Sequence, residues 1–128
     1  MKKEENIATK DRNERKAKKV TFRVPIHEVT VFVMVTRDIP GAYKREFGTD
    51  IGDTQMACLG YLKRKFGLFF EPGAERRPEI VAHEIFHLTH RILEKNQMNF
   101  DAEHHEMGSY LCEYLTKKVF GAFRGLKI

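Results

Sequence analysis

Residues 83–87 read H-E-x-x-H, in the middle of a stretch that carries apolar residues at helical spacing. On a helix, positions i and i+4 lie on one face about one turn apart, so His83 and His87 can share a ligand if this stretch is helical. Two imidazoles at this spacing can hold one Zn²⁺, and the carboxylate of Glu84 can act as general base to a metal-activated water. The pattern therefore predicts a helix that carries a metal site, and it points to metal-assisted hydrolysis, most directly of a peptide bond.

The flanking residues predict where this helix begins and ends. Pro78 and Glu79 suit a first turn of a helix. An N–H group there has no partner within the helix, so proline loses nothing by lacking one, and the acid lies near the positive end of the helix dipole. Lys95 and Asn96 suit the end. Two apolar stripes run along the helix, one of Val81, Ile85, Leu88 and Ile92 and one of Ala82, Phe86, Thr89 and Leu93. We therefore expect the helix to be packed on more than one side, with the two histidines facing a cleft.

His90 falls on the same face as the pair, about one turn beyond His87. A straight helix carries it past the metal, so we expect it to support the ligands or line the cleft, or else to be an ordinary solvated histidine. The plainest alternative for the whole motif is a buried helix whose two histidines bind nothing.

A catalytic zinc takes three protein ligands and keeps one position open, so a third ligand must come from elsewhere. A second helix is predicted after Asp101, a good N-cap residue. Its apolar residues recur at helical spacing, namely Met107, Tyr110, Leu111, Tyr114, Leu115 and Val119. Candidate ligands crowd its first turns, namely Glu103, His104, His105 and Glu106. Glu106 lies at the edge of the apolar arc near Tyr110 and is the first candidate, and Glu103 is the alternative. Each of them alone also fits a solvated helix start.

The pattern I-V-A-H-E-I-F-H at residues 80–87, followed by E-x-x-x-Y-L at residues 106–111, resembles small phage and prophage zinc peptidases of a minimal gluzincin type. The likeness extends over about residues 19–118 and includes the strand region near Phe22. It implies that His83 and His87 are zinc ligands, that Glu106 is the third ligand and that Glu84 is the base. It implies nothing about the substrate.

This chain departs from the broader gluzincin pattern at one position. An Asp that orients a ligand histidine often follows the ligand Glu by four residues, and here that position is Tyr110. Either the Tyr110 hydroxyl makes this contact or another group does. An oxyanion stabiliser is also needed, and Tyr110, Tyr114 and His90 are the candidates.

The rest of the chain is predicted to be scaffold. Residues 20–24 alternate as a strand does, and residues 29–35 are apolar on both faces, which predicts a strand covered on both sides. A short helix over residues 40–47 closed by Gly48, a hairpin of residues 56–62 and 68–70, and a frayed end over residues 121–128 complete the prediction. Zinc peptidases commonly pair an extended substrate with an edge strand, for which we expect residues 68–70 or 56–62.

These elements predict an α+β fold of zincin-like type: a small, mostly antiparallel sheet packed on a central H-E-x-x-H helix, with a second C-terminal helix closing the site. We expect one domain over residues 20–128. Residues 1–19 hold eight basic and four acidic residues and predict a disordered basic tail. The tail is expected to aid solubility, and contact with nucleic acid is the alternative.

The remaining expectations concern location and activity. There is no run long enough to span a membrane and no secretory start, and Cys58 and Cys112 suit buried thiols better than a disulfide, so we expect a cytoplasmic protein. The function expected is that of a zinc metallopeptidase with one Zn²⁺ per chain and a peptide or protein substrate. The alternative is a zinc-binding regulatory module of phage origin with little or no catalysis. The sequence indicates no oligomeric state.

Overall fold

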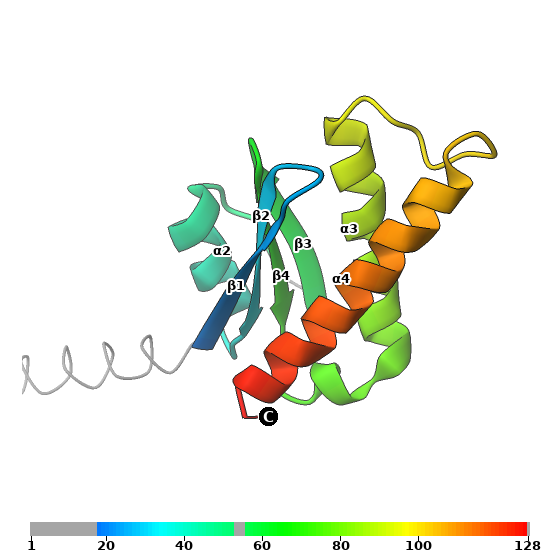
Figure 1. Ribbon diagram of the computed structural model, residues 1–128. Helices are drawn as coiled ribbons and strands as arrows, with labels where there is room; N and C mark the ends of the chain where they lie inside the picture. Colours follow the sequence, from blue (N-terminus) through cyan, green and yellow to red (C-terminus); the bar gives the residue numbers. More distant parts are fainter. Residues whose placement is uncertain (1–17, 53–55, 128) are drawn as a thin grey trace, which may run out of the picture.

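The computed structural model describes residues 18–52 and 56–127, which form a four-stranded sheet and three α-helices (Figure 1). The strands are β1 (Lys18–Val24), β2 (Val29–Val35), β3 (Ala57–Leu62) and β4 (Lys65–Phe70). The predicted α+β class is confirmed. Residues 1–17, which make up most of the predicted tail, lie outside the described residues, and Lys18 and Lys19 already belong to β1.

The sheet is mixed, with the strand order β1-β2-β4-β3. Each hairpin is antiparallel, whereas the central strands β2 and β4 run parallel. The prediction of a mostly antiparallel sheet holds for the two hairpin pairs, but it did not include the parallel central pair. It arises because the chain leaves β2, passes through α2 (Ile39–Phe47) and returns along β3, so that β4 comes to lie beside β2.

Helices cover both faces of the sheet. Helices α3 (Pro78–Lys95) and α4 (His105–Gly125) lie on one face and α2 lies on the other (Figure 1). Side chains of β2 alternate between two buried clusters, since Val31 and Val33 meet the α3 side and Phe32 and Met34 meet the α2 side. The expectation that this strand is covered on both faces is confirmed. In the described part of the chain, no helix has both the length and the apolar character that crossing a membrane would need.

Helix α2 matches its prediction closely. It starts one residue earlier than expected, and Asp38 caps it by accepting a hydrogen bond from the Gly41 N–H at 3.0 Å. It ends at Gly48, whose φ of 73° is the left-handed conformation that glycine adopts most readily.

Helix α3 begins and ends as predicted, and its first apolar stripe is buried. The second stripe is only half right. Thr89 and Leu93 are buried, but Ala82 and Phe86 are exposed, and the Phe86 side chain keeps 53% of its area accessible. The reason is that Phe86 turns away from the sheet to meet the ring of Phe100, at 5.9 Å between centroids.

Helix α4 differs from the prediction at both ends. It begins at His105, because Asp101 caps a separate preceding turn by accepting from the N–H groups of Glu103 and His104. The frayed end predicted over residues 121–128 is wrong, since the helix continues to Gly125. Phe123 holds it there, buried with its ring 5.2 Å from that of Phe70.

The second hairpin sets which strand lies at the edge. Strand β4 is paired on both sides, so residues 68–70 cannot offer a free edge, and that half of the edge-strand prediction is wrong. Strand β3 is one of the two edge strands of the sheet, and β1 is the other. It follows directly on Met56 and lies beside α3, which brings the outer edge of the sheet to the H-E-x-x-H helix.

Candidate metal centre

The rotation of α3 is fixed by its buried stripe. Val81, Ile85 and Leu88 are fully buried against the sheet. His83 and His87 are each one or two residues from the nearest of these positions, which is about 100–200° around the helix, so both face outward and are exposed. The first turn is held by Arg77, whose guanidinium Nε donates to Glu79 at 2.9 Å. The helix therefore presents His83 and His87 together on an accessible face.

The two histidines point at each other. Their Nε2 atoms are 3.0 Å apart, with the ring centroids 4.6 Å apart and the ring planes at 81°. Two nitrogens bound to one tetrahedral zinc at about 2.05 Å lie about 3.3 Å apart. The observed spacing is close to that value and joins the atoms that would ligate. Without metal, the same two nitrogens share one hydrogen bond when one of them carries a proton.

The lowered pKa of His87 is favourable for binding a metal. Burial and, after it, the positive charges of His83 and Arg91 lower the pKa of His87. A metal binds the neutral imidazole, so a lowered pKa keeps the competing proton away at neutral pH.

Glu84 lies in a pocket beside this pair. The pocket has a volume of about 310 Å³ and is lined by Met56, Ala57, Glu79, Ile80, His83 and Glu84. Glu84 is only 7% exposed, and this burial raises the pKa of its carboxyl, although the charge of His83 opposes the shift. A buried carboxylate with raised proton affinity, next to an outward-facing histidine, is the arrangement that general base chemistry uses.

The edge of the sheet forms the opposite wall of this pocket. Met56 and Ala57 stand where the chain enters β3, so the Glu84 pocket opens beside the outer strand. Met56 and Ala57 belong to residues 56–62, one of the two segments predicted to form the edge strand at the site, whereas Glu79 was not predicted to line the pocket. The choice between the two segments depends on the parallel pairing of β2 with β4, which places β3 at the edge.

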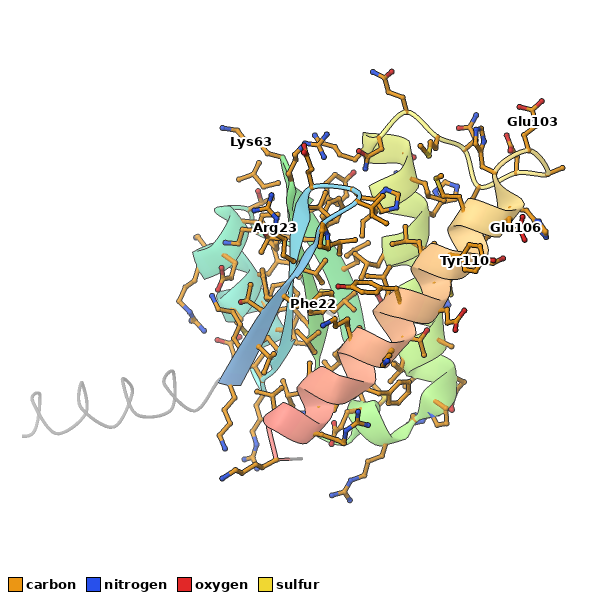
Figure 2. The ribbon with its side chains drawn as sticks, viewed as in Figure 1. Phe22, Arg23, Lys63, Glu103, Glu106 and Tyr110 are labelled. Atoms are coloured by element: carbon orange, nitrogen blue, oxygen red, sulfur yellow. The ribbon has the colours of Figure 1, made fainter. Side chains whose placement is uncertain are left out.

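The described residues provide no third side chain beside the two histidines: in residues 18–52 and 56–127, no group of three His, Cys, Asp or Glu side chains is placed to hold a metal. Glu106 instead lines a hollow between α4 and residues 24–27, together with Tyr110 and Tyr114. Glu103 is exposed in the turn before α4. Figure 2 shows Glu103, Glu106 and Tyr110 along the first part of α4 and the turn that leads into it.

The rotation of α4 explains this separation. Gly108 is buried under the ring of Phe100, and Phe100 in turn packs on Phe86 of α3. Glu106 precedes Gly108 by two residues, which is about 200° around the helix, so it faces away from this contact. Gly108 and Phe100 are structural residues that the sequence analysis did not single out.

The other predicted supporting residues make different contacts, although the positive charge of His90 is among the causes that lower the pKa of His87. His90 is exposed and lies 3.9 Å from a carboxylate oxygen of Glu94, with which it pairs when protonated. The Tyr114 hydroxyl donates to the carbonyl of Arg23 at 3.2 Å, which ties α4 to β1. The structure thus brings together His83, Glu84 and His87, with His90 near enough for its charge to act on His87, whereas Tyr110 and Tyr114 line the hollow between α4 and residues 24–27.

The two cysteines are free and half-buried, as expected for thiols without a disulfide. Burial, and then the negative charge of Glu84, raises the pKa of Cys58 to about 11. This thiol therefore stays protonated at neutral pH. The charge of Glu84 on α3 thus acts on a side chain of β3.

Comparison with protein-family models, with curated proteins and with solved structures finds no match to this chain. The resemblance to phage zinc peptidases therefore rests on its motif residues alone and stays a prediction. A functional proposal must be built on the side chains of α3 and the strand beside them.

Proposed function

We propose that this protein is a zinc-dependent hydrolase of peptide bonds, in which His83 and His87 hold the metal and Glu84 is the general base. One observation carries the proposal. The Nε2 atoms of the two histidines converge to 3.0 Å, and one of these histidines, His83, lines a pocket together with the buried carboxylate of Glu84. An ordinary solvated helix face has no reason to combine these features.

The residues present fit two coordination positions of zinc. Both ligands are imidazole nitrogens, which zinc prefers, and the lowered pKa of His87 favours binding. Glu106 and Glu103 were expected to supply a third position, but both lie away from the pair. The proposal therefore assigns two protein ligands and depends on neither glutamate.

When bound, zinc would polarise the scissile carbonyl and acidify a water molecule. Glu84 then takes the proton from the attacking water and delivers it to the leaving amine. Its burial raises the pKa of the carboxyl, so the group can both accept and return a proton nearer to neutral pH than an exposed Glu can.

The edge strand supports a peptide substrate. Among the described strands none lies beyond the outer edge of β3, so this edge can pair with an extended chain through backbone hydrogen bonds. Met56 and Ala57 bring that edge to the pocket of Glu84. A peptide added along β3 would thus run past the histidine pair, and we assign to β3 the substrate-binding role that the sequence left open between two strands.

The proposal is tested by incubating the zinc-loaded full chain with a broad peptide library and reading cleavage by mass spectrometry. We expect cleavage that a chelator abolishes and that zinc restores. Glu84→Gln should retain zinc and lose cleavage. Cleavage that is unaffected both by the chelator and by Glu84→Gln would overturn the assignment.

A second candidate is a zinc-binding module that does not hydrolyse its partner. The separation of Glu106 and Tyr110 from the histidine pair favours it, because both were expected to complete the catalytic centre. On this reading the protein binds zinc through His83 and His87, yet no peptide of the library is cut. Association with nucleic acid through residues 1–19 would be tested separately, by salt-dependent DNA binding with and without those residues.

A further inference from the structure

Arg91 connects the helix of the histidine pair with the edge strand of the sheet. It follows His87 by one turn on α3, and its positive charge is among the causes that lower the pKa of His87. Its guanidinium carbon lies 5.7 Å from the ring centroid of Tyr61 on β3. The Tyr61 ring is stacked in turn on buried Phe66, with 5.6 Å between the centroids. The guanidinium is therefore held over the strand that we assign to substrate binding.

Strand β3 and helix α3 run in the same direction along the proposed cleft. At the start of the strand, Ala57 shares a pocket with Glu84, and near its end Tyr61 meets Arg91. Arg91 lies about 6 Å beyond His87 along the helix axis, which is the length of about two residues of an extended peptide. A peptide paired with the outer edge of β3 would thus pass Arg91 about two residues from the histidine pair.

Most hydrogen-bond donors of Arg91 are available to a ligand. Only its Nη1 donates to a side chain of the described residues, namely to the two carboxylate oxygens of Glu94 at 3.3 and 3.4 Å. These distances are longer than the roughly 2.7–2.9 Å of a strong charge-assisted bond. The Arg91 side chain keeps 45% of its area accessible. A guanidinium held on an aromatic ring, with free N–H groups along its edge, suits bidentate binding of a carboxylate.

The end of the cleft around Arg91 carries an excess of positive charge. Residues 57–64 and 88–95 contain four basic residues, Lys63, Arg64, Arg91 and Lys95, and one acidic residue, Glu94. Figure 2 shows Lys63 at the tip of the hairpin that β3 forms with β4. Glu94 therefore offsets only part of the charge, and an anionic group of a ligand is favoured here.

We propose that Arg91 binds a carboxylate of the peptide substrate, about two residues from the scissile bond, and so determines substrate specificity. The carboxylate belongs either to an acidic side chain or to the C-terminus of the peptide, since both present the same two oxygens. The proposal rests on the function proposed above, because it uses the same cleft. It adds a substrate class, namely extended peptides with a carboxylate on the Leu62 side of the histidine pair.

The test is direct binding of peptides to the zinc-loaded full chain carrying Glu84→Gln, which should leave a bound peptide uncut. The probes are short fluorescein-labelled peptides of alanine and threonine, in which one glutamate or one glutamine is moved along the sequence. Each is made with a free and with an amidated C-terminus, and affinity is measured by fluorescence anisotropy. We expect the peptide with a carboxylate in register to bind about three- to tenfold more tightly than its amide counterpart. The two kinds of pair show which source of carboxylate is used.

Variants of Arg91 show whether this preference comes from its guanidinium. Arg91→Gln should remove the difference between carboxylate and amide probes, and Arg91→Lys should retain part of it, since lysine keeps the charge but not the planar fork. Arg124→Gln is the matched control. Arg124 is also exposed, but it precedes Gly125, which lies against Val20 of β1 at the other edge of the sheet. This control should keep the full preference.

Three results would overturn the inference: no binding of any probe, no preference for a carboxylate in any register, or a preference that survives Arg91→Gln. Cleavage by the wild type without any carboxylate preference would reject the role of Arg91 and leave the hydrolase intact. Binding that depends on Arg91, without cleavage by the wild type, would sustain that role and reject the hydrolase. The two proposals therefore fail in distinguishable ways.

Discussion

Two hollows of the surface differ in nearly every respect: the pocket beside Glu84 that His83 lines, called the histidine pocket below, and the hollow between α4 and residues 24–27, called the α4 groove below. The first is about half the volume of the second, contains two carboxylates and a histidine, and lies beside an edge strand. The second is lined mainly by apolar side chains of α4 and the β1–β2 turn. The sequence pattern treated His83, His87 and Glu106 as one unit, yet they fall on these two surfaces. The rotation of α4 about its axis is set by the contact of Gly108 with Phe100, and it turns Glu106 away from the two histidines.

The largest expected effect concerns the chemistry of the histidine pocket. Glu84→Gln should lower the rate of peptide hydrolysis by at least about 10²-fold, because it removes the general base and keeps the side-chain volume. Turnover and zinc content are measured on the same preparation. Glu79→Gln is the matched control, since Glu79 lines the same pocket but is exposed and bonded to Arg77. Equal losses in the two variants would contradict the role given to Glu84.

The next prediction concerns the contact that keeps the two surfaces apart. Gly108→Ala should destabilise the fold by about 1–3 kcal/mol, because a Cβ at this position collides with the Phe100 ring. Gly121→Ala, on the same helix, meets nothing closer than 3.8 Å. It should be neutral or stabilise by up to about 1 kcal/mol through helix propensity. Urea unfolding of both variants checks this, and similar effects would show that Gly108 does not lock α4.

A third prediction lies on the opposite face, where α2 joins the sheet. Burial would raise the pKa of Glu46, but hydrogen bonds from Lys65 at 2.7 Å and Lys19 at 2.9 Å outweigh it, and the pKa is lowered. A lowered folded-state pKa means that the carboxylate adds stability above its unfolded pKa, and that this stability is lost as pH falls through the folded value.

Glu46→Gln should therefore cost about 1 kcal/mol near neutral pH, where the ion pairs are intact. The difference from the wild type should shrink as the pH is lowered through the acid range. Urea unfolding at a series of pH values gives this difference directly. A gap that is constant with pH would mean that the pairs with Lys65 and Lys19 contribute nothing.

The smallest expected effect separates the two surfaces most sharply. Glu106→Ala should leave zinc content unchanged, because Glu106 lines the α4 groove rather than the histidine pair. His87→Ala, prepared in parallel, should lose zinc. If Glu106→Ala loses zinc as well, the first turns of α4 reach the histidines when metal binds, and the third ligand implied by the family resemblance is correct.

Local patterns in the sequence predicted much of this molecule. The α3 boundaries, the capped α2 helix and the doubly covered β2 follow from proline, glycine and apolar spacing within a few residues. The parallel pairing of β2 with β4, and with it the choice of β3 as the edge, depends on how α2 returns the chain, which no local pattern encodes.

The helix ends and the site show the same limit. The apolar residues after Gly121 looked like a frayed end because their partner, Phe70, is more than fifty residues away. The H-E-x-x-H residues were placed correctly on one helix face, since i and i+4 are neighbours on any helix. No local pattern sets the position of Glu106 relative to the histidines, because it depends on the rotation of α4, which is fixed by the contact between Gly108 and Phe100.

The central claim is that His83 and His87 form a zinc site, and elemental analysis of the purified full chain tests it most directly. After zinc loading and removal of excess metal, we predict about one zinc per chain in the wild type and none in the variant His83→Ala/His87→Ala. A wild-type chain that retains no metal, or a double variant that retains as much as the wild type, would contradict the account.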